Sequence, residues 1–367
     1  MRIRAKRESL ANAFSIASAA SGGQTSPMPI LQNVKLEAIE EGLILSATDM
    51  EIGIRYRVSG VDVLEKGKVC LNAARMTGIV REDTSDTIEI DGSKEGAKIT
   101  GKNSLYHVLG EDPEEFPAIP TFGEGRGVTI GQELLAGMLE KTIFSAATEA
   151  TRYSLNGVLF DMSKGKLLLV ATDGRRLAKI EGKTQGEMPK HEEDVIVPVK
   201  GLTQLVRLLG NGKEEVQLKV EQSGLLAKTE QAELFARLVE GHFPPYQEVV
   251  PKESDKKASV SRETLLRAVR QASLMTSEES RAVKLHFFAS GLTVSSQSPQ
   301  AGDAKIELDI AYDGAELDIA FNPQFLIDFL KVAGTDAITI EMKDKDKPAV
   351  FKTDTHYLYL VMPVSLE

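Results

Sequence analysis

The sequence lacks the features that mark secreted and membrane-bound proteins. Its 367 residues include one cysteine, Cys70, which excludes an internal disulfide framework and which we expect to be buried in the apolar run KVCLNA. The N-terminus, MRIRAKRESL, has no apolar signal-peptide core. No later stretch approaches the roughly 18 continuous apolar residues of a membrane span. We therefore expect a cytoplasmic protein with no membrane partner.

Recognisable catalytic and metal-binding motifs are also lacking. The five histidines are scattered, with no pair at the spacing that places two ligands on one helix face or in one zinc loop. Gly182-Lys183-Thr184 imitates the end of a phosphate-binding loop, but Leu177 stands where that loop needs its first glycine. Neither G-x-S-x-G nor H-E-x-x-H occurs. We expect no enzyme, no metal site and no cofactor.

The chain instead contains an internal repeat. Its length exceeds that of one ordinary domain, and its composition, 42% apolar and 27% charged, is that of a globular protein. Three segments align on Glu8, Glu133 and Glu263: RAKRESLANAFSIASAA, TIGQELLAGMLEKTIFSAA and SVSRETLLRAVRQASLM. Each has apolar or small residues on one helical face, which predicts an amphipathic helix.

The same elements follow in each copy. Hairpins are predicted at VKLEAIEEGLILSATD, VLFDMSKGKLLLVATD and VKLHFFASGLTVSSQS, and second helices at LNAARMTGIV, PVKGLTQLVRLL and NPQFLIDFLKVA, before further alternating strands. This order predicts an α+β fold with three similar domains, residues 1–123, 124–252 and 253–367. Sheet edges in such domains must be covered or paired, and end-to-end pairing into a closed ring would remove them.

The segment Ala171-Thr172-Asp173-Gly174-Arg175-Arg176-Leu177-Ala178 resembles the signature of the bacterial DNA polymerase III beta subunit, the sliding-clamp family. The segments MPILQNVKL, ATDMEI, RYSLNGVLF, FPPYQEVVP and LVMPVSL also resemble clamp segments, in clamp order. The resemblance implies three topologically similar DNA-clamp domains per chain and a head-to-tail homodimer. Its ring of six domains would have sheets outside and two helices per domain lining the hole.

The function implied is that of a non-catalytic processivity factor at the nucleoid. It would encircle double-stranded DNA without reading sequence. It would also tether the DNA polymerase III alpha subunit, the clamp loader, and other polymerases and repair proteins that carry clamp-binding peptides. The net charge of −10 argues at first against a DNA partner, but an acidic exterior with basic inner helices would reconcile the two.

Three sets of residues follow from the resemblance. The DNA-facing set is Gln24, Arg75, Arg152, Lys200, Arg207, Arg281 and Lys284. The dimer-interface set is Tyr106 and Val108 against Leu274 and Met275. The peptide-groove set is Leu155, Thr172, Gly174, Arg175, Leu177, Pro244, Val249, Pro348, Leu360, Met362, Pro363, Val364 and Leu366.

Two alternatives stay open from the residues alone. One is a scaffold of the same fold that docks peptides but holds no DNA. The other, with less support, is an enzyme that uses the Gly182-Lys183-Thr184 segment.

Overall fold

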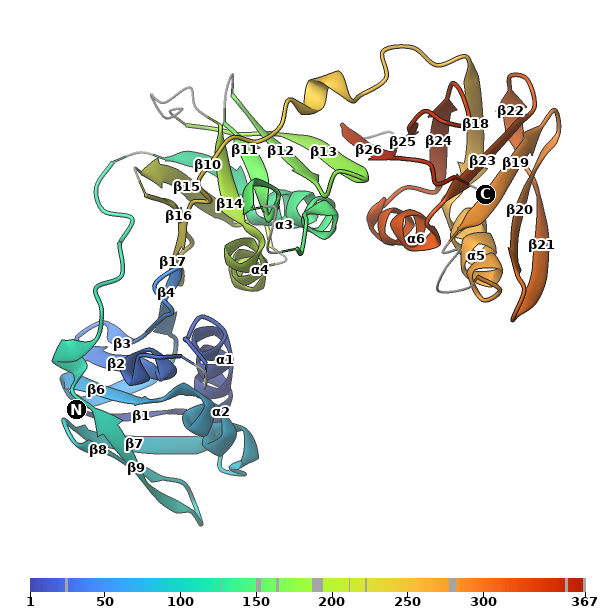
Figure 1. Cartoon of the computed structure of the whole chain (residues 1–367). Coiled ribbons are helices and arrows are strands. Elements are labelled where there is room, and N and C mark those ends of the chain that lie inside the picture. The colour runs from blue at the N-terminus through green and yellow to red at the C-terminus, as the bar shows by residue number, and fades with distance from the viewer. Residues whose placement is uncertain are drawn as a thin grey trace. The chain divides into compact units, whose positions relative to one another are not determined.

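The element order of the fold repeats three times along the chain. The structure is a computed structural model that describes every residue except 24–25, 126, 150–152, 163–164, 187–193, 211, 222, 277–281, 354–355 and 366–367. Each repeat opens with a strand and a helix, continues through four or five strands to a second helix, and ends on three strands (Figure 1). The internal repeat predicted from the sequence is confirmed.

The elements of the first repeat are β1 (Arg2–Lys6), α1 (Arg7–Ser18), η1 (Pro29–Gln32), β2 (Asn33–Ile39), β3 (Gly42–Thr48), β4 (Ile52–Val58), β5 (Val61–Glu65), β6 (Gly67–Asn72), α2 (Ala73–Glu82), β7 (Thr87–Ser93), β8 (Gly96–Thr100), β9 (Leu105–Glu111) and η2 (Pro113–Glu115). Those of the second are β10 (Val128–Gly131), α3 (Gln132–Glu140), η3 (Ile143–Ser145), η4 (Tyr153–Leu155), β11 (Gly157–Asp161), β12 (Lys166–Thr172), β13 (Arg176–Lys183), β14 (Val195–Pro198), α4 (Val199–Leu208), β15 (Glu215–Glu221), β16 (Gly224–Lys228), β17 (Ala232–Arg237) and η5 (Tyr246–Glu248). Those of the third are β18 (Lys256–Ser261), α5 (Arg262–Ser273), β19 (Val283–Phe288), β20 (Gly291–Ser298), β21 (Gly302–Asp309), β22 (Ala311–Asp313), β23 (Leu317–Phe321), α6 (Pro323–Val332), β24 (Ala337–Met342), β25 (Ala349–Lys352) and β26 (Tyr357–Val361).

Local sequence explains where the helices begin. The side-chain oxygen of Asn72 accepts the backbone N–H of Arg75 at 3.0 Å and caps α2. Asn322 accepts the N–H of Gln324 at 2.9 Å and caps α6, with Pro323 in the first turn, where its missing donor costs nothing. Each cap therefore fixes the point at which a strand of the sheet gives way to a helix.

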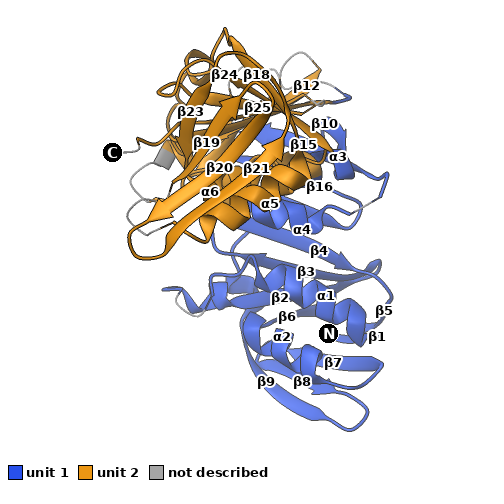
Figure 2. Cartoon of the chain, turned by 90° about the vertical axis from the view of Figure 1, so that its right-hand side faces the viewer, with its two compact units in different colours: residues 1–136, 184–191, 200–238 blue, residues 137–183, 192–199, 239–367 orange. Residues whose placement is uncertain are grey.

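The chain forms two compact units, coloured separately in Figure 2. Unit 1 is residues 1–136, 184–191 and 200–238 and contains one sheet in the order β10-β15-β16-β17-β4-β3-β2-β6-β9-β8-β7-β1-β5. Unit 2 is residues 137–183, 192–199 and 239–367. It contains the sheets β14-β11-β12-β13-β26-β25-β24-β18-β22 and β21-β20-β19-β23.

Two antiparallel ladders join successive repeats. β17 of the second repeat pairs with β4 of the first, from Ala232↔Tyr56 to Ala236↔Ile52. β26 of the third repeat pairs with β13 of the second, from Arg176↔Val361 to Ile180↔Tyr357. The second repeat is therefore divided, because β15–β17 join unit 1 whereas β11–β14 join unit 2. The domain boundaries 1–123, 124–252 and 253–367 stay predictions.

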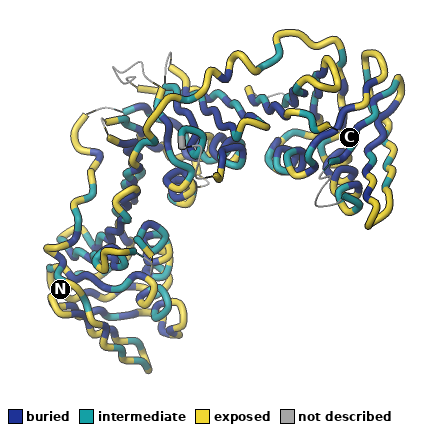
Figure 3. The backbone as a smooth tube through the Cα atoms, viewed as in Figure 1, coloured by how far each residue is buried: buried dark blue, intermediate teal, exposed yellow. Residues whose placement is uncertain are grey.

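Strand alternation separates a helix-covered face from an outer face. In β26, Tyr357 and Tyr359 are buried on the helix side, where the Tyr359 ring stacks on Phe329 of α6 with centroids 4.9 Å apart. Leu358 and Leu360 point to the other face. Buried and exposed segments alternate in this way along many of the strands (Figure 3).

Two further expectations can be placed on the structure. Cys70 is fully buried in β6, and burial raises the pKa of its thiol to about 12. Gly182 and Lys183 are part of β13 rather than a loop that precedes a helix, so they do not form a phosphate-binding loop. Within the described part of the chain, no helix is long and apolar enough to cross a membrane.

Candidate functional site

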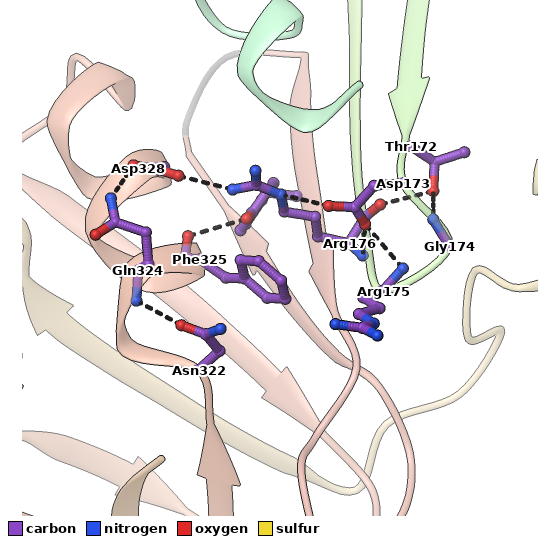
Figure 4. A network of polar contacts seen from close by, with 10 residues as sticks. Thr172, Asp173, Gly174, Arg175, Arg176, Asn322, Gln324, Phe325 and Asp328 are labelled. Atoms are coloured by element: carbon purple, nitrogen blue, oxygen red, sulfur yellow. Dashed lines mark hydrogen bonds and ion pairs between the residues drawn. The ribbon is translucent and has the colours of Figure 1, made fainter. Parts of the chain in front are cut away.

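The signature segment forms the turn between β12 and β13. The Thr172 hydroxyl donates to the carbonyl of Arg176 at 2.6 Å and accepts the N–H of Gly174 at 3.1 Å. Asp173 Oδ1 accepts the N–H groups of Arg175 and Arg176 at 2.9 and 3.0 Å (Figure 4). Gly174 has φ +87°, a conformation that glycine adopts at little cost. The Thr and Asp side chains thus hold the turn in one shape.

Arg176 connects this turn to α6. Its Nε donates to Asp173 Oδ2 at 3.0 Å and its Nη1 to Asp328 Oδ2 at 2.7 Å, while the guanidinium lies 4.5 Å from the ring centroid of Phe325 (Figure 4). The side chain is only 12% exposed. Nearby, the Tyr359 hydroxyl donates to the carbonyl of Phe325 at 2.9 Å, and burial raises the pKa of that hydroxyl. The charge is therefore both paired and packed.

The first repeat contains the same turn without the same surroundings. Thr48 donates to the carbonyl of Ile52 at 2.7 Å and accepts the N–H of Met50 at 3.0 Å. Met50 has φ +77° where Gly174 stands in the second repeat. The Thr-Asp pattern of the signature is therefore a structural requirement of the turn. The function must reside in what surrounds it.

A buried apolar cluster covers the outer face of the ladder between β13 and β26. Leu177 pairs with Leu360 across that ladder, and Leu360 pairs with Val350 across the next one. Tyr246, from the linker between the second and third repeats, packs with these three residues. Leu177 and Leu360 are each only 2% exposed. They are buried with Tyr246 of the linker and are not an open wall, so we call this pair the floor of the predicted groove.

The end of the chain borders this cluster. The N–H of Met362 donates to the carbonyl of Arg175 at 2.8 Å, and the N–H of Val364 donates to the carbonyl of Ala320 at 2.9 Å. The Met362 side chain is 38% exposed and that of Val249 is 52% exposed. Apolar surface is therefore available beside the floor.

The predicted groove residues are brought together to different degrees. Backbone bonds and strand pairing connect the turn, the floor and the chain end, which are Thr172, Gly174, Arg175, Leu177, Leu360, Met362, Pro363 and Val364. Leu155 accepts the N–H of Ala147 at 2.9 Å, and Ala147 lines a cavity beside the turn. Pro244 is exposed in the linker, while Val249 and Pro348 line a separate depression. Leu366 lies outside the described residues.

The cavity beside the turn has a volume of about 710 Å³ and includes residues that the sequence analysis missed. Arg175 and Arg176 line it, together with Asn322, Gln324 and Phe325 from the start of α6. Asn322, Gln324 and Phe325 lie about 150 positions after the two arginines. Asp328, which follows them in α6, is 152 positions from Arg176. The one local signal was the Asn-Pro helix start, which predicts a cap and not a cavity.

The predicted DNA-facing residues fall into three groups. Arg75 on α2 and Arg207 on α4 are exposed, as is Lys200 at the start of α4, which forms an ion pair with Asp49 and lies 3.6 Å from Glu51. Gln24, Arg152 and Arg281 lie outside the described residues. The sequence analysis missed Arg81 on α2 and Arg270 on α5, which are also exposed.

Lys284 lies on a strand and not on a helix, and its contact with DNA stays a prediction. It alternates in β19 with the buried residues Val283 and Leu285, and its ammonium pairs with Asp318 at 2.8 Å. Strand alternation therefore directs Lys284 to the sheet face opposite the one that α5 covers. This position does not support the predicted location near the helices.

The predicted interface residues lie at or near strand edges. Over Leu105–Leu109, β9 pairs with β8 on one side only, and β21 is the last strand of its sheet. Leu274, just after α5, is 74% exposed and Met275 is half-buried. Tyr106 is half-buried and Val108 is 4% exposed, whereas Leu105 and Leu109, which the sequence analysis missed, are 55% and 81% exposed.

Among the residues that the structure describes, no group of three or more His, Cys, Asp or Glu side chains could hold a metal ion.

Known proteins match the chain over its length. Models of the N-terminal, central and C-terminal domains of the DNA polymerase III beta subunit match residues 1–120, 129–245 and 247–365. The beta sliding clamp of Chlamydia muridarum is 31% identical over 346 residues, which cover 94% of this chain and 93% of that protein. That of Vibrio cholerae is 29% identical and both chains are covered completely.

Solved structures agree. The DNA polymerase sliding clamp from Bacillus subtilis superposes with a TM-score of 0.94 at 26% identity. The DNA polymerase III subunit beta from Pseudomonas aeruginosa bound to griselimycin superposes with a TM-score of 0.92 at 29% identity. Each comparison covers 100% of both chains.

The Arg176–Asp328 pair provides a test of how the turn is held. We expect Asp328→Asn to lower the free energy of unfolding by about 1–3 kcal/mol, because it weakens a charged hydrogen bond to a largely buried guanidinium. Glu263→Gln is the matched control, since Glu263 also pairs at 2.7 Å, with Arg267, but the two side chains are 72% and 69% exposed. That control should cost at most about 0.5 kcal/mol. Urea unfolding would measure both, and equal losses would contradict this role of Arg176.

Proposed function

Because this chain belongs to the family of the DNA polymerase III beta subunit, the bacterial sliding clamps, we propose that it closes as a ring of two chains around duplex DNA and holds partner proteins through the groove beside β13 and β26. It is a sliding clamp, a non-catalytic processivity factor of DNA replication. We further propose that it works in the cytoplasm at the nucleoid, where its DNA is.

The two internal ladders support the ring. β4, β13 and β21 occupy equivalent places in the three repeats, as do β9, β17 and β26. Within the chain, β4 pairs with β17 and β13 pairs with β26. The strands of these two kinds left over are β21, the last strand of a sheet in the third repeat, and β9 in the first. A second copy supplies the missing partner for each, so two chains close head to tail with one heterologous contact used twice.

The side chains at this contact are those of the proposed interface set. Leu274 and Met275 lie at the third-repeat end, and Tyr106 and Val108 lie in β9 with the exposed Leu105 and Leu109. We propose that this apolar surface is buried when β9 pairs with β21 of the partner. Val108 is already buried in its own chain, so it contributes by shaping β9 and less by direct contact.

Charge placed at the contact should separate the chains. We expect Leu274→Asp together with Leu109→Asp to give a folded monomer, because each buries a carboxylate in the contact. Leu64→Asp, at an exposed apolar residue of the edge strand β5, should leave the dimer intact. Sedimentation velocity measures the state, and circular dichroism checks the fold. An unchanged dimer in the double variant would rule out this pairing.

The proposed DNA contacts are basic side chains on the helix faces. Arg75 on α2 and Arg207 on α4 are exposed, and Lys200 forms an ion pair with Asp49. Gln24, Arg152 and Arg281 are proposed from the family resemblance alone. Contacts to phosphate carry no sequence information, which suits a protein that must move along DNA. Ring closure, rather than tight contact, then retains the DNA.

Salt dependence distinguishes these contacts from ordinary surface charge. We expect Arg75→Ala with Arg207→Ala to reduce the slope of log affinity against log salt by about 0.9 for each phosphate that the variant no longer neutralises. The control is Lys98→Ala with Lys257→Ala, two exposed lysines in β8 and β18 that alternate with buried residues. An equal change of slope in both variants would contradict the proposal that the helix faces, and not the strand faces, contact DNA. Retention on circular but not linear DNA separates the clamp from a scaffold that holds no DNA.

The proposed partners are the DNA polymerase III alpha subunit, the clamp loader and other polymerases and repair proteins, each through a short linear peptide. The groove set supports this, since Met, Leu, Val and Pro side chains offer adaptable apolar walls with few unpaired donors. Met362 and Val249 are the large apolar members of the described set that are exposed. The cavity lined by Arg175 and Asn322 adds a mostly polar surface on the side of the turn.

A change in the groove should abolish peptide binding and leave the ring intact. We expect Met362→Asp to weaken the binding of the clamp-binding segment of a polymerase III alpha subunit by on the order of a hundredfold, because a carboxylate replaces apolar contact area. Met28→Asp is the matched control, since Met28 is 46% exposed outside the groove. Fluorescence anisotropy measures the affinity and sedimentation the dimer. Wild-type affinity in Met362→Asp would refute the site.

A further inference from the structure

A second depression shares two residues with the groove set, and its charged residues have no part in the function proposed above. Its volume is about 530 Å³, and it lies between the linker residues 248–254, the end of β24 and the start of β25. Val249 and Pro348, two residues of the groove set, line it. We call this depression the lysine pocket, because its charged rim includes Lys252, Lys343, Lys347 and Lys352.

Strand register places the lysine pocket and the groove floor on one sheet face. Glu341 pairs with Val350, Val350 with Leu360, and Leu360 with Leu177, in one row across β24, β25, β26 and β13. Directly opposed residues on neighbouring strands point to the same face. Val350 belongs both to the cluster beneath the groove and to the wall of the pocket. A peptide that leaves the groove past Val350 therefore enters the lysine pocket.

The charges of the pocket are unevenly paired. Lys352 binds Glu341 at 2.6 Å and Lys343 binds Glu253 at 3.4 Å. Over the described part of the chain, the ammonium groups of Lys252 and Lys347 have no ion-pair partner, and Glu248 is the one lining carboxylate left. In a chain with net charge −10, this is a local excess of available positive charge. Such a site favours a carboxylate over a neutral polar group.

We propose that the lysine pocket binds acidic residues that flank the core of a clamp-binding peptide. The partner segments preferred by this clamp then carry Asp or Glu on the flank that passes Val249 and Pro348. The apolar lining, with Val249 and Pro251, contacts the aliphatic part of that flank, while Lys252 and Lys347 bind its carboxylates. The inference rests on the peptide groove proposed above and adds a specificity for charge to it.

Matched peptides and matched lysines test the proposal. The probe is the labelled clamp-binding segment of a polymerase III alpha subunit, extended at either end by Asp-Asp-Glu or by Asn-Asn-Gln. When the extension is at one of the two ends of the segment, the acidic peptide should bind the wild-type dimer about threefold to tenfold more tightly than the amide peptide at low salt. The preference should shrink at high salt. Lys252→Glu with Lys347→Glu should remove the preference and leave the affinity of the unextended segment unchanged.

Lys345→Glu is the control, because Lys345 is exposed in the same hairpin as Lys347 but does not line the pocket. It should keep most of the preference. Equal affinities for acidic and amide extensions at both ends of the segment would overturn the proposal. So would an equal loss of preference in the control, which would indicate a diffuse field. Failure of the unextended segment to bind wild-type dimer would instead overturn the peptide groove itself, and the pocket proposal with it.

Discussion

The backbone N–H and C=O groups at the edges of β-sheets need hydrogen-bond partners. The architecture of this chain depends on which strands supply them. Each repeat presents strands whose N–H and C=O groups are unpaired on one side. The ladders β4–β17 and β13–β26 pair two such sets of edges within the chain. In the described part of the chain, β21 and the Leu105–Leu109 part of β9 are the strands of the same two kinds that lack such a partner, so the proposed head-to-tail dimer needs no new type of contact.

Periodic local features of the fold could be predicted from the sequence. Amphipathic stripes predicted α1, α3 and α5, and helix-start residues such as Asn72 and Pro323 predicted α2, α4 and α6. Glycine-centred hairpins predicted β2–β3, β11–β12 and β19–β20. The register of the ladders between repeats could not be predicted, because strand partners about 180 residues apart leave no periodic signal. For the same reason, the division of the second repeat between two compact units does not follow the composition of the linkers.

The site shows the same limit more sharply. The signature was noticed because it resembles a family motif, yet Thr172 and Asp173 act on their own turn, as Thr48 does in the first repeat. Arg176 stood in the quoted signature but not among the predicted site residues, since its importance comes from Asp328, 152 positions away. Lys284 was expected on or near a helix but lies in β19, and charge and sequence position do not say toward which side a strand residue points. The sequence also does not indicate that Leu177 and Leu360 are buried in one cluster with Tyr246.

The joints between repeats are made of main-chain hydrogen bonds, and this bears on how such a protein can change over time. A bond between N–H and C=O is indifferent to the side chains on either strand, provided that neither residue is proline and the register is kept. The Leu177–Leu360 pair of one joint corresponds to Gly53–Phe235 in the other, where Ile119 from the linker lies over the glycine. Paired side chains at a joint can therefore change in sequence while the pairing of the two strands is kept. A TM-score of 0.94 at 26% identity is what such joints allow. Substitutions in this architecture therefore accumulate at surface and packing side chains. The backbone pairing that joins the repeats depends on few side-chain identities.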